Sequence, residues 1–128
     1  MRLLLDTHIW LWMIGEPEKI GAHLRRELSS AEELWLSPIS TWEALVLARK
    51  GRIHLHEQVE AWIEHATTPF REAPLTHAVA LESQRIAVAH SDPADRFIAA
   101  TAKVLGLTLA TADTRLLGLG DVATLANR

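Results

Sequence analysis

The sequence of 128 residues contains no cysteine. This absence excludes disulfide bridges, zinc–thiolate sites, iron–sulfur clusters and thiol catalysis. No apolar run approaches the ~20 residues that a membrane-spanning helix requires, because charged residues recur along the whole chain. Any chemistry must therefore come from the side chains of Asp, Glu, His, Ser and Thr, and no membrane partner is expected.

The first residues do not have the pattern of a signal peptide. The apolar start is interrupted by Asp6 and His8, and no small-residue cleavage site follows. We therefore expect a cytoplasmic protein. The length is near the commonest size of one domain, and 48% of the residues are hydrophobic, so residues 1–128 are predicted to form a single domain.

An excess of basic residues is lacking too. The chain has 13 Lys and Arg against 16 Asp and Glu, which gives a net charge of −3. This balance argues mildly against a nucleic-acid partner, since phosphate binding normally requires a basic excess. Two bound divalent cations would change the charge to −3 + 4 = +1. Composition alone therefore leaves RNA binding open.

Short apolar runs alternate with helical periods along the chain. Strands are predicted at residues 3–5, 34–36, 70–74, 107–110 and 122–125. Helices are predicted at residues 7–14, 22–28, 40–50 and 59–66, after Thr76 with Ile86 inside, from Asp92 to Gly106, and after Asp113. This alternation indicates βαβ units and an α/β fold, a three-layer α/β/α sandwich with a mainly parallel central sheet.

Four acidic residues follow strands or begin helices of this sheet. Asp6 ends the first strand, Glu43 lies in about the first turn of the helix after the second strand, Asp95 begins the long helix, and Asp113 follows the strand at 107–110. Ligands of open parallel sheets collect at the carboxyl ends of the strands. The topology therefore predicts that all four carboxylates meet at one edge.

Four carboxylates in one crevice repel each other unless a cation lies among them. Ligand sets made only of oxygen select hard ions such as Mg²⁺ or Mn²⁺. Such an ion can orient and activate a water for attack on a phosphodiester, which is nuclease chemistry. Asp6, Glu43, Asp95 and Asp113 are thus predicted to be both metal ligands and catalytic residues.

Each acid also has an ordinary structural interpretation. Asp6 and Asp113 could cap the helices that follow them, Glu43 could be an exposed helix residue, and Asp95 could place negative charge in a first helical turn. Their convergence on one sheet edge favours the functional interpretation.

Four segments carry a resemblance to a known family. They are Leu4-Leu5-Asp6-Thr7, Ser40-Thr41-Trp42-Glu43, Asp92-Pro93-Ala94-Asp95-Arg96 and Thr111-Ala112-Asp113. In order and spacing they resemble PIN-domain ribonucleases, and within that family VapC-type toxins of toxin–antitoxin pairs. The resemblance covers essentially the whole chain, and the segments DPADRFIAATA and TAD are specific in combination.

The resemblance implies a PIN-like sandwich and an Mg²⁺- or Mn²⁺-dependent endoribonuclease that forms a homodimer and is inhibited by a small antitoxin. The four acids fall on the acidic positions of the family, and Thr111 on its frequent Ser or Thr. The acidic net charge departs from what RNA binding would suggest, which leaves the RNA-binding track undetermined.

Further residues are candidates for supporting roles. Asp92, Thr111 and Arg96 could position a metal ligand or a metal-bound water, although Asp92 followed by Pro93 is sufficiently explained as a helix N-cap. His8 and His90 could assist proton transfer, although a metal-activated water needs no protein base.

The basic cluster Arg49, Lys50 and Arg52 could bind the RNA backbone, but a solvated helix end is the better interpretation. Four tryptophans, Trp10, Trp12, Trp42 and Trp62, could stack on bases, although aromatic residues at helical spacing usually belong to a core or an interface. The helix at residues 9–14 is apolar all round, which suggests a dimer or antitoxin contact.

Two other functions compete with the nuclease hypothesis. A phosphorylation-dependent receiver domain would need paired acids after the first strand and a lysine after a late strand, where this chain has Asp6 alone and Thr111-Ala112-Asp113. A PIN-like scaffold could bind RNA without cutting it, but a non-catalytic site gains nothing from uncompensated charge.

Overall fold

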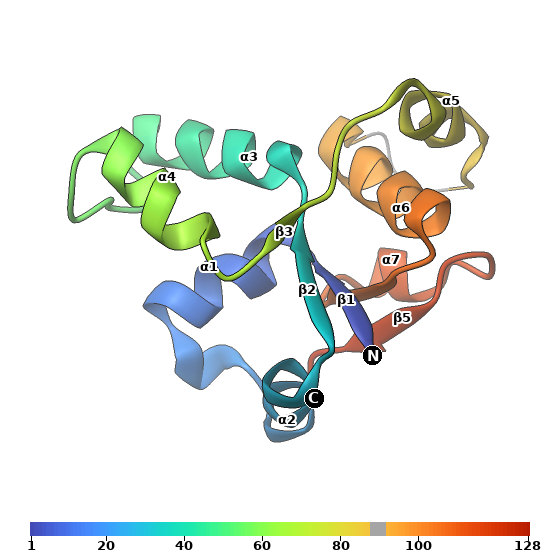
Figure 1. Ribbon diagram of the computed structural model, residues 1–128, viewed down its shortest axis with the longest axis horizontal. Coiled ribbons are helices and arrows are strands. Elements are labelled where there is room, and N and C mark those ends of the chain that lie inside the picture. Colours follow the sequence, from blue (N-terminus) through green and yellow to red (C-terminus); the bar gives the residue numbers. More distant parts are fainter. Residues whose placement is uncertain (88–91) are drawn as a thin grey trace.

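The computed structural model describes residues 1–87 and 92–128 and places five parallel strands between two layers of helices (Figure 1). The strands are β1 (Arg2–Leu5), β2 (Glu33–Leu36), β3 (Arg71–Glu72), β4 (Thr108–Thr111) and β5 (Thr124–Ala126), in the spatial order β3-β2-β1-β4-β5. All four described strand pairs are parallel. The predicted three-layer α/β/α sandwich is confirmed.

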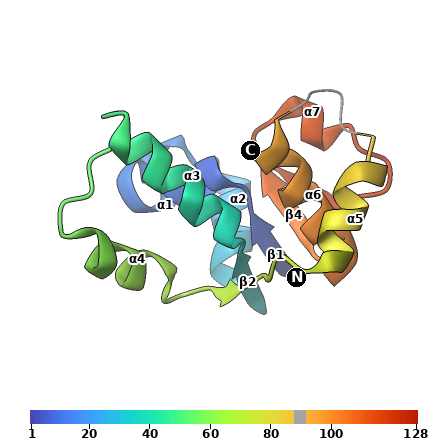
Figure 2. The same ribbon diagram turned by 90° about the horizontal axis from the view of Figure 1, so that it is seen from above.

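The helices divide between the two faces of the sheet, as the view from above shows (Figure 2). One face carries α1 (Thr7–Gly15), the 3₁₀ turn η1 (Pro17–Lys19), α2 (Ala22–Ser30), α3 (Pro38–Arg49) and α4 (Val59–Thr67). The other carries α5 (His77–Arg85), α6 (Pro93–Leu105) and α7 (Thr114–Leu117). Over residues 1–87 and 92–128, no helix is long and apolar enough to cross a membrane.

Alternating residues of the central strands feed two separate cores. Leu3 and Leu5 of β1 pack with α1 to α4, whereas Leu4 packs with α5, α6 and α7. In β4, Leu109 and Ala110 divide in the same way. Successive side chains of a strand point to opposite faces, so continuous apolar runs are what a sheet covered on both faces requires.

The predicted start and end of the long helix are confirmed. Asp92 is the N-cap of α6, and its Oδ1 accepts a hydrogen bond from the Ala94 N–H at 3.0 Å. Pro93 occupies the first helical position. Gly106 ends the helix with a φ of +67°, a left-handed conformation that costs glycine little.

Several predicted boundaries are wrong by a few residues. Helix α3 begins at Pro38 rather than at residue 40, because Ser37 is its N-cap and accepts from the Ile39 N–H at 3.0 Å. Glu43 is consequently the sixth residue of α3, in its second turn. Strand β4 extends to Thr111, which pairs with β5, and α5 ends before Ile86.

The remaining edge strands also differ from their predicted ranges. β3 covers only two residues of the predicted 70–74, and β5 begins later than residue 122.

The strand order reverses next to β1, and the region of Asp6, Glu43, Asp95 and Asp113 around this point is called the crevice below. From β1 the chain passes to β2 and β3 on one side, and it later returns to form β4 and β5 on the other. The carboxyl ends of β1 and β4 lie side by side, since the Asp6 N–H donates to the Ala110 carbonyl oxygen at 2.9 Å. Open α/β sheets bind ligands at such a point, where the strand order reverses.

Candidate active site at the carboxyl edge of the sheet

Asp6 follows β1 directly, and only 5% of its surface is exposed. Its Oδ1 accepts a hydrogen bond from the Thr7 N–H at 2.8 Å, so it does cap α1. Its Oδ2 accepts a second bond from the Thr111 hydroxyl at 2.6 Å. The capping interpretation and a position in the acidic crevice therefore hold together for this residue.

Thr111 connects the ends of β1 and β4. Besides donating to Asp6, its Oγ1 accepts a hydrogen bond from the Asp113 N–H at 3.0 Å. The side chain is completely buried. One hydroxyl thus fixes the spacing between the acid that follows β1 and the acid that follows β4.

Glu43 reaches the crevice from α3 and is held there by Thr7. The Thr7 Oγ1 lies 2.5 Å from Glu43 Oε1 and 2.8 Å from the Ser40 Oγ. A hydroxyl has one hydrogen, so Thr7 donates to one of these partners and accepts from the other. When Glu43 is ionised it must accept, and Ser40 then donates to Thr7. This chain of hydroxyls joins the first turn of α1 to α3.

Asp95 lies in the first turn of α6 and is half-buried. Its pKa is raised from 3.8 to about 7, mainly by burial and then, in decreasing order, by the negative charges of Asp6, Asp92, Glu43 and Asp113. Four acids therefore act on this carboxyl, one within α3 and three at the N-caps of α1, α6 and α7. The fold brings together all four acids that the sequence singled out.

Asp6 and Glu43 also have raised pKa values. Burial raises the pKa of Asp6, and the hydrogen bonds from Thr111 and Thr7 and the nearby His8 oppose that rise. Burial likewise raises the pKa of Glu43, with the Thr7 hydroxyl opposing and the charges of Asp6 and Asp92 adding to the effect. Burial is thus the main cause of the raised pKa of both acids, and neighbouring acids add to it.

Asp113 has a cationic neighbour that the sequence reasoning missed. Its Oδ1 accepts from the Arg115 N–H at 2.9 Å and from Nε at 3.1 Å, while its Oδ2 accepts from Nη2 at 3.0 Å. Such a two-pronged pairing is among the stronger charge-assisted arrangements. The order Asp-x-Arg at a helix start was the available signal, because the side chain at the third position can fold back onto the cap.

The donor set of the crevice suits a hard divalent cation, since it offers carboxylate and hydroxyl oxygens. Within the described residues, however, no group of three or more His, Asp or Glu side chains is already placed to hold a metal ion. Asp6 is held by Thr111, Glu43 by Thr7 and Asp113 by Arg115. Each of these carboxylates keeps further acceptor sites beside its present hydrogen bonds.

The remaining sequence candidates lie around the crevice or apart from it. The Arg96 guanidinium donates to the carbonyl oxygens of Ser83 at 2.9 Å and Ile86 at 3.1 Å, and so holds the end of α5 against α6. His8 is exposed near Asp6 and Glu43, and His90 lies outside the described residues.

The basic cluster Arg49, Lys50 and Arg52 is exposed at the far end of α3. Arg49 lies six positions after Glu43 in the helix, which corresponds to about 9 Å along the helix axis.

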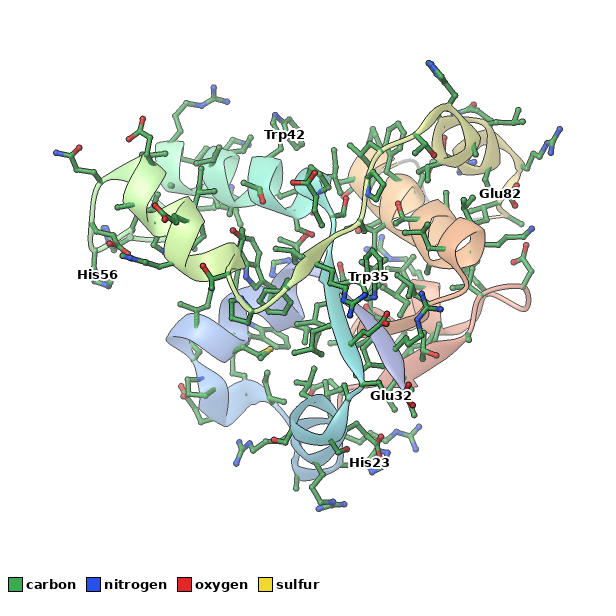
Figure 3. The ribbon with its side chains drawn as sticks, in the orientation of Figure 1. His23, Glu32, Trp35, Trp42, His56 and Glu82 are labelled. Atoms are coloured by element: carbon green, nitrogen blue, oxygen red, sulfur yellow. The ribbon has the colours of Figure 1, made fainter. Side chains whose placement is uncertain are left out.

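A cavity of about 440 Å³ opens beside the acids, between the start of α1, α3 and the start of α6. Glu43 and Asp92 form part of its lining together with Trp42, which is 56% exposed. Trp10 and Trp62 are instead buried against each other, with ring centroids 5.5 Å apart. Of these three tryptophans, only Trp42 adjoins the site; it projects outward from α3 in Figure 3.

The apolar helix α1 exposes less hydrophobic surface than its sequence suggested. Ile9 and Trp10 belong to the core, residues 11–13 are half-buried, and Ile14 is 47% exposed. The most exposed apolar side chain among residues 9–14 is therefore that of Ile14, near the end of the helix.

Comparison with known proteins gives a consistent relationship. The family model "PIN domain" matches residues 3–122. Ribonuclease VapC22 of Mycobacterium tuberculosis is 34% identical over 115 residues, which cover 89% of this chain and 88% of that protein.

Solved structures share the fold over the whole chain. DNA-bound VapBC of Salmonella typhimurium aligns with a TM-score of 0.75 and 18% identity, covering 100% of this chain and 99% of the other. A toxin–antitoxin complex from Klebsiella pneumoniae aligns with a TM-score of 0.71 and 20% identity, covering 98% of each chain.

Proposed function

This chain belongs to the PIN domain family, and from that premise we propose that it is a metal-dependent endoribonuclease, the toxin of a toxin–antitoxin pair. The observation that carries the proposal is the gathering of Asp6, Glu43, Asp95 and Asp113 near the carboxyl ends of β1 and β4, close enough for the charges of the other three to raise the pKa of Asp95. A related chain that is a ribonuclease supports the same activity.

Asp6, Glu43, Asp95 and Asp113 are the residues that would hold Mg²⁺ or Mn²⁺. When bound, such an ion orients a water, lowers its pKa and offsets the charge that develops on a phosphodiester. The chain itself supplies placement. Asp6 is fixed from both sides by backbone and hydroxyl donors, and Glu43 is positioned by Thr7. In such a hydrolysis a bond would form between phosphorus and the water oxygen, the bond from phosphorus to one ribose oxygen would break, and the proton lost by the water would balance the one taken up by that ribose oxygen.

The supporting residues divide by their contacts. Thr111 positions Asp6 and the backbone of Asp113, so it shapes the site without a need to touch the substrate. Asp92 is an N-cap whose charge also acts on Asp95 and Glu43. Arg115 forms an ion pair with Asp113 and lies near Asp95 and Asp92, where its guanidinium partly offsets the acidic charge.

The proposed toxin binds an RNA substrate, a second copy of the chain and a small antitoxin protein. It acts in the cytoplasm, and residues 1–128 form a single domain. A toxin–antitoxin complex of the same fold supports the antitoxin partner. The exposed end of α1 around Ile14 offers apolar surface for either protein contact. The basic residues Arg49, Lys50 and Arg52 remain a candidate track for the RNA backbone.

Membership of the PIN domain family argues against the alternative of a receiver domain. A PIN-like scaffold that binds RNA without cutting it is distinguished by experiment. The purified protein is incubated with labelled single-stranded and structured RNA in Mg²⁺ or Mn²⁺, and in EDTA. We expect cleavage only with the metal, and none from the Asp6→Asn variant.

The matched control is Asp121→Asn, which removes an exposed acid paired with Lys103 outside the crevice. It should cleave like the unmodified protein. Cleavage that persists in EDTA, or that survives Asp6→Asn, would contradict the metal mechanism. RNA binding without any cleavage would favour the scaffold.

A further inference from the structure

We propose that Arg115 binds a phosphate of the RNA substrate next to the one that is cleaved, while Asp113 holds the guanidinium in place. This inference rests on the proposed ribonuclease function and adds to it a residue that binds the substrate. The proposed metal ligands are all acids, so they repel the phosphates that flank the cleaved bond. A cationic side chain beside the acids would offset this repulsion where the RNA backbone passes.

The pairing with Asp113 uses one edge of the Arg115 guanidinium. Its Nε donates to Asp113 Oδ1 at 3.1 Å, and its Nη2 donates to Oδ2 at 3.0 Å. A guanidinium carries five N–H groups in a planar fork, so the edge formed by Nη1 and Nη2 is directed away from this partner. Among the residues that the structure describes, Asp113 accepts the hydrogen bonds of this guanidinium. The second edge is thus available to another acceptor.

The guanidinium is open to solvent and lies close to the acids. The side chain of Arg115 is 55% exposed. The hydrogen bonds to Asp113 raise the pKa of Arg115, and the charges of Asp95 and Asp92 add to that effect. The backbone N–H of Arg115 also donates to Asp113 Oδ1 at 2.9 Å, which fixes the two residues relative to each other. A substrate can therefore reach this cation beside the crevice.

Other basic side chains that the sequence places near the acids are directed elsewhere. The Arg96 guanidinium, one residue after Asp95, donates to two carbonyl oxygens at the end of α5. The basic cluster at residues 49–52 lies at the far end of α3. Of these candidates, Arg115 is the one that contacts an acid of the crevice.

A phosphate is the group that suits the second edge of the guanidinium. Two parallel N–H groups match two phosphate oxygens, and such two-pronged pairs are among the stronger charge-assisted contacts. Because this edge faces away from Asp113, the phosphate bound there is a neighbour of the one held at the acids. Contacts to phosphate position a nucleic acid without reading its bases, so Arg115 would add affinity for RNA of any sequence.

The test measures RNA binding in an Asp95→Asn background, where cleavage is expected to stop, in a fixed excess of Mg²⁺. The cleavage site is first mapped with the unmodified protein. The two phosphates that flank the cleaved one are then replaced, one at a time, by uncharged methylphosphonates. Dissociation constants are measured by fluorescence anisotropy at several salt concentrations for the parent, Arg115→Gln and Arg115→Lys. The control is Arg26→Gln, which removes an exposed arginine of α2.

We expect Arg115→Gln to weaken binding by roughly 5- to 30-fold, as is usual for losing a hydrogen bond to a charged group at an exposed position. The plot of log K against log salt should become less steep by about 0.7, the value for one phosphate contact on a single strand. Arg115→Lys should recover only part of the affinity, because it keeps the charge without the fork. Arg26→Gln should bind like the parent.

The modified RNAs show whether the contact is direct. One of the two methylphosphonates should weaken binding to the parent by a similar factor and have little further effect on Arg115→Gln, because both changes remove the same contact. Additive losses would overturn the inference, since they would indicate a general effect of charge. Parent-like binding by Arg115→Gln, or full recovery by Arg115→Lys, would overturn it as well.

Failure of the inference and failure of the proposed function give different results. If the unmodified protein cleaves no RNA in Mg²⁺ or Mn²⁺ and the parent binds none, the ribonuclease proposal fails, and the role of Arg115 fails with it. If the unmodified protein cleaves RNA but the parent and Arg115→Gln bind it equally well, the ribonuclease function stands and only the phosphate contact is refuted.

Discussion

Replacing Asp95 by asparagine should separate catalysis from stability more clearly than any other substitution in the crevice. The asparagine side chain has nearly the same shape and cannot ionise. Because Asp95 is surrounded by the charges of Asp6, Asp92, Glu43 and Asp113, its removal relieves repulsion in the metal-free protein. We expect Asp95→Asn to abolish RNA cleavage while making the metal-free fold more stable above neutral pH.

The magnitude follows from the pKa of Asp95, which rises from 3.8 to about 7 on folding. For a fully buried group this rise corresponds to about 4 kcal/mol. The carboxyl is only half-buried, and solvent screening reduces the effect to roughly 1–2 kcal/mol.

The folded protein holds this proton more tightly than the unfolded chain does. The stability that Asp95 contributes is therefore fully present below pH 3.8 and is lost as the pH rises through about 7.

The assay is urea unfolding at pH 4, 6 and 8 in EDTA, on the unmodified protein, Asp95→Asn and Glu60→Gln. Glu60 is an exposed acid of α4, so its removal matches the charge change away from the crevice. The free energy of unfolding of Asp95→Asn, relative to the unmodified protein, should increase between pH 4 and 8, and that of Glu60→Gln should not. A constant difference for Asp95→Asn, or cleavage retained by it in Mn²⁺, would refute the reasoning.

Three further substitutions test the roles of neighbouring residues. Asp92→Ala removes the cap of α6 and should cost about 0.5–2 kcal/mol in urea unfolding, while cleavage measured at low temperature largely survives. Arg115→Gln frees Asp113 from its paired cation and should tighten Mn²⁺ binding in calorimetric titration, whereas Arg26→Gln, a matched loss of charge on α2, should leave it unchanged. Thr111→Val removes the hydroxyl that donates to Asp6 and accepts from the Asp113 N–H. The free energy of unfolding should fall by about 1–3 kcal/mol in thermal or urea unfolding.

The sequence predicted the layers of the fold because its signals were local and repeated. The apolar run at Leu3 to Leu5 could only be covered on both faces, and Asp92-Pro93 with Gly106 defined both ends of α6. The pair Ser37-Pro38 carried the same signal as Asp92-Pro93. Overlooking it displaced the start of α3 and placed Glu43 one turn too early.

The convergence of the acids was predictable, but their contacts were not. Topology sends Asp6 and Asp113 to neighbouring strand ends whatever the side chains do. The Thr7 contact with Glu43 joins residues 36 positions apart, and no local pattern encodes it. The cavity at Trp42 arises from the spacing between α3 and α6, which depends on the packing of two different cores.

The division of the interior into two cores makes this crevice a seam. Glu43 is carried by the layer of α1 to α4 and Asp95 by the layer of α5 to α7, and the two layers meet through the sheet and through the contact of α3 with α6. A core substitution that lets either layer slide by a fraction of an ångström would misalign the acids before it unfolded the protein. If cells are selected for survival while they express the toxin, the inactivating substitutions should therefore lie in both cores, and many of the mutant proteins should remain folded.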